Sequence, residues 1–147
     1  MTKDQLATKI QAIKKQKKLT WNQIAEAVGM SPVWTTAALL GQMSMEPQHA
    51  EKAAKLLGLN AEETDLLCEI PYRGSLPTQV PTDPLIYRFY ELVQVYGTTW
   101  KALIEEEFGD GIMSAIDFDM KMDRQPDPKG DRVKLTMSGK FLSYKRY

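Results

Sequence analysis

Apolar side chains recur at helical spacing through roughly the first 70 residues. Leu6, Ile10 and Ile13 lie three or four positions apart and predict a helix over residues 4–18. Similar patterns predict further helices over residues 20–29, 31–41, 45–60 and 60–70. We therefore expect five short helices that share one apolar core.

The second and third of these helices have clear boundaries. Thr20 and Ser31 are favourable N-caps, Pro32 suits a first helical position, and Gly29 suits a C-cap. Five short helices with a glycine-containing tight turn between the second and third resemble the helix-turn-helix of phage-repressor-type domains. The residues that carry this resemblance are Gln23, Ala25, Gly29, Ser31 and Gly41.

The segment IPYRGSLPTQVPTDP holds four prolines and one glycine, so it is neither one helix nor a central strand. Such a composition favours a stiff, extended linker. We therefore predict a helical domain over residues 1–70, a linker over 71–82 and a second domain over 83–147.

The second domain opens with DPLIYRFYELVQVYG, in which Asp83 can cap a helix that Gly97 would end. Its interior is apolar on nearly every side, so we expect it to be buried. Arg88 and Glu91 interrupt this apolar surface one turn apart. The two form a solvated ion pair, a buried structural ion pair, or a binding site for a small anion.

The pattern then changes its period. After a second helix over residues 98–109, residues 111–122 alternate as a strand does, and residues 132–139 alternate again beyond a Pro/Gly turn region. Ser114 is the exception in an apolar row that also holds Ile112, Ile116, Phe118 and Met120. A serine hydroxyl at such a position bonds to backbone or serves as a donor in a site.

These elements predict an α+β fold: a five-helix bundle followed by a small domain of two helices and two strands. The second domain has only about 65 residues, which make a thin core, and two strands leave exposed edges. Assembly of several copies would cover both, so we expect an oligomer held largely by residues 83–147.

Charge separates along the chain although its net value is zero. Residues 1–20 carry six lysines and one acid, residues 84–119 carry seven acids and two bases, and residues 120–147 carry eight bases and three acids. Such asymmetry suits nucleic acid or subunits that complement each other. No apolar run is long enough to span a membrane, and the N-terminus lacks the apolar region of a signal peptide, so we expect a cytoplasmic protein.

The chain has one cysteine, Cys68, and one histidine, His49. These exclude an internal disulfide and the usual Cys/His zinc site within one chain, and we expect no metal and no cofactor. Cys68 ends an apolar helical run and is interpreted as a small core residue. His49 is interpreted as an ordinary residue in the first turn of a helix.

DNA binding is the main alternative function, in the form of an oligomeric helix-turn-helix regulator. A recognition helix needs side chains that reach base edges, and phosphate contacts need cations. Residues 31–41 contain no charged residue, and no Lys or Arg lies between Lys18 and Lys52. We therefore expect no nucleic-acid partner and interpret the helical domain as a packing or assembly unit.

The stretch DPLIYRFYELVQVYGTTWKALIEEEFGDGIMSAIDF, followed by GDRVKLTMSGKFLSYK, closely resembles the cyanase family, the cyanate hydratases or cyanate lyases. The resemblance covers the whole second domain, and the helical bundle with its proline-rich linker also fits. It implies that bicarbonate and cyanate react to carbamate and carbon dioxide, and that carbamate then yields ammonia and carbon dioxide.

The resemblance further implies a decamer built from five dimers, with active sites shared between subunits. The family's catalytic arginine, glutamate and serine fall on Arg88, Glu91 and Ser114. Bicarbonate would be a co-substrate, and no cofactor or metal would be needed. These residue types suit small anionic substrates, because a guanidinium and a hydroxyl both donate hydrogen bonds to anions.

Overall fold

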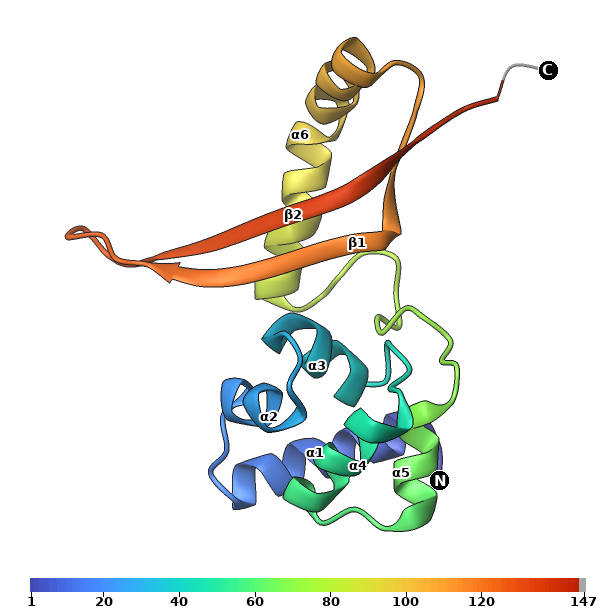
Figure 1. Cartoon of the computed structure of the whole chain (residues 1–147). Coiled ribbons are helices and arrows are strands. Elements are labelled where there is room, and N and C mark those ends of the chain that lie inside the picture. Colours follow the sequence, from blue (N-terminus) through green and yellow to red (C-terminus); the bar gives the residue numbers. More distant parts are fainter. Residues whose placement is uncertain (146–147) are drawn as a thin grey trace. The chain divides into compact units, whose positions relative to one another are not determined.

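The computed structural model describes residues 1–145 and shows a mixed fold of helices and one two-stranded sheet (Figure 1). The elements are α1 (Lys3–Gln16), α2 (Trp21–Val28), α3 (Pro32–Leu39), α4 (Pro47–Leu57), α5 (Ala61–Cys68), α6 (Pro84–Phe108), β1 (Gly111–Gln125) and β2 (Arg132–Ser143). The chain divides into two compact units: Met1–Ser75 with Met120–Thr136, and Leu76–Asp119 with the described residues from Met137 on.

Local hydrogen bonds explain where α2 and α3 begin and end. The Thr20 hydroxyl accepts a hydrogen bond from the backbone N–H of Gln23, whose side chain in turn accepts from the N–H of Thr20. At α3 the Ser31 hydroxyl accepts a hydrogen bond from the N–H of Trp34 at 3.2 Å, and Gly29 ends α2 in the left-handed region at φ 83°. The predicted caps at these helices are confirmed.

The core of the helical region is built from side chains that α1 to α5 turn toward one another. Thr35 lies among them, fully buried, on the inner side of α3. The buried apolar cluster consists of Leu6, Ile10, Ile24, Val28, Ala38, Leu39, Met45, Ala50, Ala53, Leu57 and Leu67. The apolar periodicity predicted the core face of α1, because Leu6 and Ile10 are buried in this cluster and Ile13 packs against it, partly buried.

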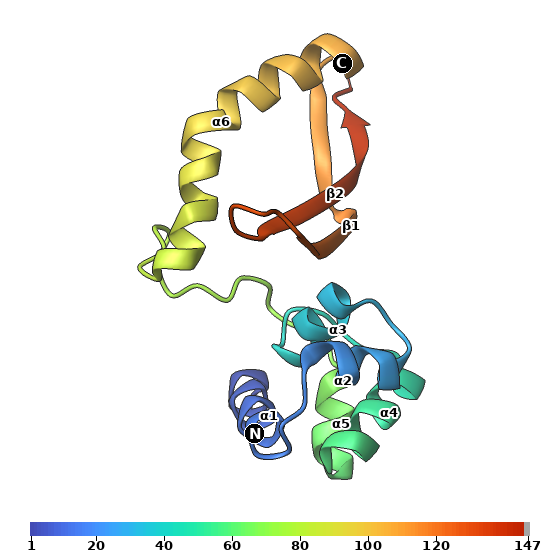
Figure 2. The same ribbon diagram turned by 90° about the vertical axis from the view of Figure 1, so that its left-hand side faces the viewer.

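The prediction of two helices after the linker is wrong, because α6 runs without interruption from Pro84 to Phe108. Gly97 lies inside it with a helical backbone, and a Cβ added there would meet only Val93 Cγ1, at 3.7 Å. A glycine inside a helix costs only about 1 kcal/mol relative to alanine, which flanking turns offset. Figure 2 shows that α6 bends along its length instead of breaking.

The start and end of α6 follow local signals. Asp83 Oδ1 accepts hydrogen bonds from the N–H groups of Leu85 and Ile86, each at 2.9 Å, and Pro84 takes the first helical position. Gly109 follows the last turn with φ 89°, a conformation that favours glycine. The cap that the sequence predicted at Asp83 is confirmed.

The expected burial of this helix is not found within a single chain, because α6 contains no buried residue. Leu85 and Val93 expose 69% and 56% of their surface. The hairpin is the only other regular element of this part of the described chain, and two strands cannot surround a helix. The apolar surface of α6 therefore faces outward in one copy.

The hairpin is longer than predicted at both of its ends. β1 and β2 form a two-stranded sheet, and two ion pairs cross the turn between them: Arg124 with Asp131 and Arg132 with Asp127, both at 3.1 Å. β1 extends to Gln125, into the predicted turn region, whereas β2 begins at Arg132 as predicted and continues to Ser143.

The predicted alternation of β1 is only partly found. Phe118 and Met120 are half-buried and Ser114 is buried, but Ile112 and Ile116 of the same expected row are 47% and 73% exposed. The backbone next to Ser114 explains part of this difference, because two consecutive N–H groups bond to its side chain, unlike those of a regular ladder. None of the helices in residues 1–145 combines the length and apolar composition that a membrane crossing requires.

Candidate active site

Arg88 and Glu91 lie on successive turns near the start of α6. Arg88 Nη1 donates a hydrogen bond to Glu91 Oε2 at 2.8 Å. This hydrogen bond is the main cause that raises the pKa of Arg88 above its ordinary value, and the negative charge of Glu91 adds to it. The guanidinium is thus held at one nitrogen and keeps further N–H groups for a ligand.

The pair is solvent-accessible in one chain. Arg88 exposes 68% of its side chain and Glu91 exposes 46%. An exposed pair of this kind contributes little to stability. Of the alternatives open from the sequence, a structural pair buried by the chain itself is therefore excluded, while a solvated pair and an anion site remain.

Ser114 has the opposite environment. Among the described residues of α6, β1 and β2 it alone is buried, with 7% of its surface exposed. Its Oγ accepts hydrogen bonds from the N–H groups of Ile116 at 3.1 Å and Asp117 at 2.9 Å. These bonds occupy the oxygen lone pairs and leave the hydroxyl hydrogen as a donor.

This arrangement confirms that the Ser114 hydroxyl bonds to backbone, as a serine commonly does with residues two or three positions ahead. The N–H groups of Ile116 and Asp117 hold the serine oxygen and thereby orient its hydroxyl.

One chain carries these groups in two separate places. No hydrogen bond or ion pair among the described residues links Ser114 to Arg88 or Glu91. An aromatic pair joins α6 to β2 at the C-terminal end of the helix. The ring centroids of Phe108 and Phe141 are 5.3 Å apart there. The predicted site residues are thus not assembled into one site by this chain alone.

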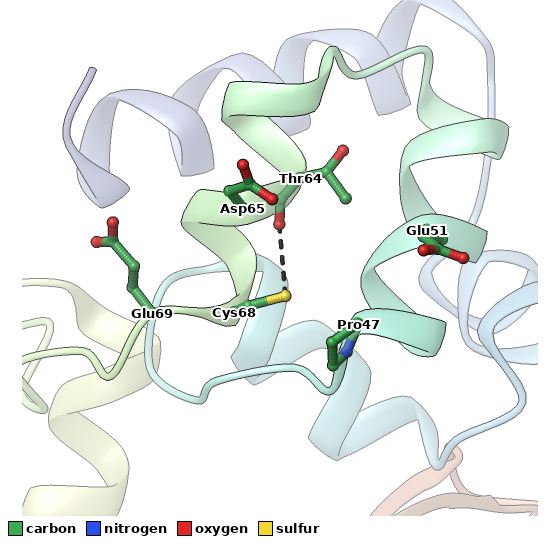
Figure 3. Close-up of a pocket in the computed structure, with 6 residues that line it drawn as sticks. All are labelled: Pro47, Glu51, Thr64, Asp65, Cys68 and Glu69. Atoms are coloured by element: carbon green, nitrogen blue, oxygen red, sulfur yellow. Dashed lines mark hydrogen bonds between the residues drawn. The ribbon is translucent and has the colours of Figure 1, made fainter.

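A surface cavity of about 340 Å³ lies between α4 and α5 (Figure 3). Its lining includes the carboxylates of Glu51, Asp65 and Glu69, which repel anions. Burial and the nearby charge of Asp65 raise the pKa of the Cys68 thiol, which disfavours the reactive thiolate. This cavity does not suit an anionic substrate.

A second cavity of about 420 Å³ lies on the hairpin, close in sequence to Ser114. Asp117 and Lys140 line it, with their charged atoms 4.0 Å apart. The other lining residues are Phe118, Asp119, Ser138 and Gly139. Gly139 was not among the candidate residues predicted from the sequence, although a glycine inside a strand indicates the close approach of another backbone.

No cluster of three or more His, Cys, Asp or Glu side chains within residues 1–145 is arranged to hold a metal ion. His49 lies in the first turn of α4, as predicted, and its ring packs edge-on against Trp34 with centroids 5.9 Å apart. Neither observation adds a further candidate to the arginine, glutamate and serine described above.

Lys3 of α1 and Lys17, which follows its last turn, have structural partners. Lys3 Nζ donates to the carbonyls of Leu66 and Glu69 at 2.6 and 2.7 Å, near the end of α5. Lys17 Nζ donates to the carbonyl of Leu56 at 2.8 Å, near the end of α4. Cations at helix C-termini satisfy free carbonyls and the helix dipole, so this basic helix needs no phosphate partner to explain its charge.

Two family models match the chain: "Cyanate hydratase, N-terminal" over residues 3–71 and "Cyanate lyase C-terminal domain" over residues 78–146. Cyanate hydratases of Dechloromonas aromatica (strain RCB) and Ralstonia pickettii (strain 12J) are each 60% identical over 147 residues, all of this chain and all of theirs. A crystal structure of cyanase from T. urticae superposes with a TM-score of 0.80 at 41% identity, covering 94% of this chain and 96% of that one.

Proposed function

The chain belongs to the cyanate hydratase, or cyanate lyase, family, and we propose that it is an enzyme that decomposes cyanate with bicarbonate as co-substrate. Membership over the full length supports cyanate as the substrate. The dependence on bicarbonate and the roles of individual residues are the finer parts of the proposal. The observation that carries them is an arginine–glutamate pair on α6 together with a buried hydroxyl donor on β1.

The proposed reaction begins with attack of a bicarbonate oxygen on the cyanate carbon. The dianionic adduct then loses carbon dioxide and leaves carbamate. The cyanate nitrogen carries no hydrogen and the carbamate nitrogen carries two, so one proton comes from bicarbonate and one from the surroundings. Carbamate takes up another proton and falls to ammonia and carbon dioxide.

Arg88 is proposed to bind the anions. Its guanidinium is permanently charged and planar, and it can hold two oxygens of a bicarbonate or of the adduct side by side. Charge builds up on the adduct as two anions combine. A fixed cation therefore stabilises the adduct more than either substrate, which is the requirement for catalysis.

Ser114 is proposed to donate its hydroxyl hydrogen to the same anion. The N–H groups of Ile116 and Asp117 hold its oxygen and polarise the O–H bond toward a third partner. Burial of the side chain reduces competition from water. A preorganised donor of this kind loses no freedom when the adduct forms.

Glu91 is proposed to orient Arg88 and to transfer protons. A carboxylate repels anions, so it does not bind the substrate directly. The reaction needs proton transfer to nitrogen, and residues 83–147 contain no histidine, which leaves Glu91 as the natural acid–base group. Its contact with the guanidinium in the single chain supports the orienting role.

A complete site is proposed to form between copies of the chain. One chain keeps the Arg88–Glu91 pair and Ser114 apart and exposes large apolar side chains on α6, β1 and β2, including Leu103, Ile116 and Val133. An exposed apolar surface of this extent is typical of an interface. Assembly as a decamer of five dimers would bury it and bring the catalytic groups together.

The helical region is proposed to be a packing unit over residues 1–70, joined by the linker 71–82 to the catalytic unit 83–147. Its helix-turn-helix resemblance gives it no DNA-binding role, because α3 has no charged side chain and the lysines at the two ends of α1, Lys3 and Lys17, donate to carbonyls of other helices. Selection from a randomised duplex pool at about physiological salt tests this. Enrichment of a defined site at nanomolar affinity would contradict it.

Ammonia release from cyanate tests the catalytic proposal directly. The reaction is followed in buffer stripped of carbon dioxide, with and without added bicarbonate. We expect turnover only when bicarbonate is present. Equal rates in both conditions would show that bicarbonate is not a substrate, even if cyanate were consumed.

A further inference from the structure

Gly139 on β2 has no room for a side chain. A Cβ added there would lie 2.6 Å from Met113 Cγ and 3.2 Å from Met113 Sδ, and closer still to the carbonyl oxygen of Ser114. The backbone conformation does not explain the glycine, because Gly139 is not among the residues with positive φ. The requirement is one of space between the two strands.

The crowded point coincides with the place where the Ser114 hydroxyl is held. The same residue that contacts Gly139 through its carbonyl turns its Oγ toward the N–H groups of Ile116 and Asp117. Both bonds are local to β1, because they join the Ser114 side chain to the N–H groups two and three residues ahead, and they depend on the backbone position of Ser114. The backbone of Ser114 must therefore stay where β2 lies against it.

We propose that Gly139 is a positioning residue for Ser114, which lets β2 approach β1 so closely that the serine hydroxyl is fixed as an anion donor. The inference rests on the proposed function of Ser114. A methyl group at position 139 would push the Ser114 carbonyl and Met113 away from β2. The hydroxyl would move with them, and a displacement of about 1 Å at a reacting centre can cost about 100-fold in rate.

A double-mutant cycle tests the coupling between the two residues. Gly139→Ala, Ser114→Ala and the double variant are compared by kcat/KM for cyanate with saturating bicarbonate. If Gly139 acts through Ser114, the double variant will lie within about twofold of Ser114→Ala alone, the usual limit of additivity. A purely structural role predicts instead that the two losses multiply.

Gly111→Ala is the matched control. A Cβ at Gly111 would lie 2.6 Å from Phe141 Cζ and 2.9 Å from Ser143 Cα, so it crowds the same pair of strands away from the serine. It should lower the thermal stability to a similar degree as Gly139→Ala. Any activity loss it causes should multiply with that of Ser114→Ala.

Each variant is first checked for its assembly state by light scattering. If Gly139→Ala does not assemble, it is combined with Met113→Ala, which removes the two side-chain contacts but keeps the contact with the Ser114 carbonyl. This double variant is compared with Met113→Ala alone, and the same cycle is run in that background. We expect the activity loss and the coupling to Ser114 to persist.

Three results would overturn the inference: parent activity in an assembled Gly139→Ala, multiplied losses in the cycle, or equal coupling of Gly111→Ala to Ser114. The first two leave the proposed function intact when Ser114→Ala itself is impaired. Parent activity in Ser114→Ala would instead remove the proposed role of the serine, and with it any residue that positions it.

Discussion

The side chains of Arg88 and Glu91 meet one turn apart on α6, with Arg88 Nη1 2.8 Å from Glu91 Oε2. The contact occupies one nitrogen of the guanidinium and leaves the other N–H groups available. Since both side chains are exposed in one chain, the pair adds little to the stability of that chain. We therefore expect the pair to act in ligand binding, and variants of either residue test this through the activity.

Arg88→Lys should lower cyanate decomposition by at least about 100-fold, although the positive charge is kept. An ammonium group cannot present two parallel N–H donors to an anion. The rate of ammonia release at saturating bicarbonate measures the effect. Arg73→Lys in the linker is the matched control. Equal activity of both variants would contradict bidentate binding of an anion by the Arg88 guanidinium.

Glu91→Gln keeps the shape of the side chain and removes its charge. We expect kcat to fall while the KM for bicarbonate changes little, because an amide can still accept a hydrogen bond from Arg88 but cannot transfer a proton. Steady-state kinetics over a range of pH distinguish the two roles. An unchanged kcat with a raised KM would assign Glu91 to orientation alone.

Ser114→Ala removes one donor and the acceptor for two backbone N–H groups. Loss of a single oxyanion-type donor typically lowers kcat about 100- to 1000-fold. Ser138→Ala, on the facing strand, is the control for removal of a hydroxyl from the hairpin. Equal rates for Ser114→Ala and the parent would exclude the serine from the site.

The catalytic unit should exist as an oligomer even without the helical region. A fragment that begins at Asp83 is expected to associate, because the exposed apolar surface of α6 and the hairpin lies within it. Light scattering of the fragment and of the full chain at several dilutions measures this. An active monomer would contradict both the assembly and the shared site.

Acid should weaken the helical region through Glu63. Its side chain is 4% exposed and pairs with Lys9, and this hydrogen bond is the main cause that lowers the pKa of Glu63, followed by the bond from the N–H of Asn60. A lowered folded-state pKa means that the unfolded chain binds more protons as the pH falls below about 5. The stabilisation is complete above the unfolded pKa and is lost as the pH falls through the folded one.

Thermal unfolding between pH 7 and pH 3 measures this contribution. The Tm of the parent should fall more steeply with acid than that of Glu63→Gln, which has no charge to lose. Glu62→Gln, at an exposed neighbouring position, should follow the parent. Parallel curves for the parent and Glu63→Gln would contradict the assignment.

Much of the fold follows from signals that act over a few residues. Caps at Thr20, Ser31 and Asp83 predicted helix starts because a side-chain oxygen near free N–H groups forms its bond regardless of distant contacts. The prediction that a helix ends at Gly97 was wrong for a related reason. The same residue ends a helix in the left-handed conformation or continues it in the helical one, and the flanking turns decide.

The sequence also determined which residues are candidates for chemistry, because charges in an apolar segment and a hydroxyl in an apolar row stand out without a structure. Only the tertiary structure showed that the Ser114 oxygen is held by two N–H groups and that Gly139 lies against its carbonyl. The two hydrogen bonds are local to β1, whereas the place of Gly139 depends on how closely β1 and β2 approach. That distance is a property of two segments packed together, and no pattern along one of them encodes it.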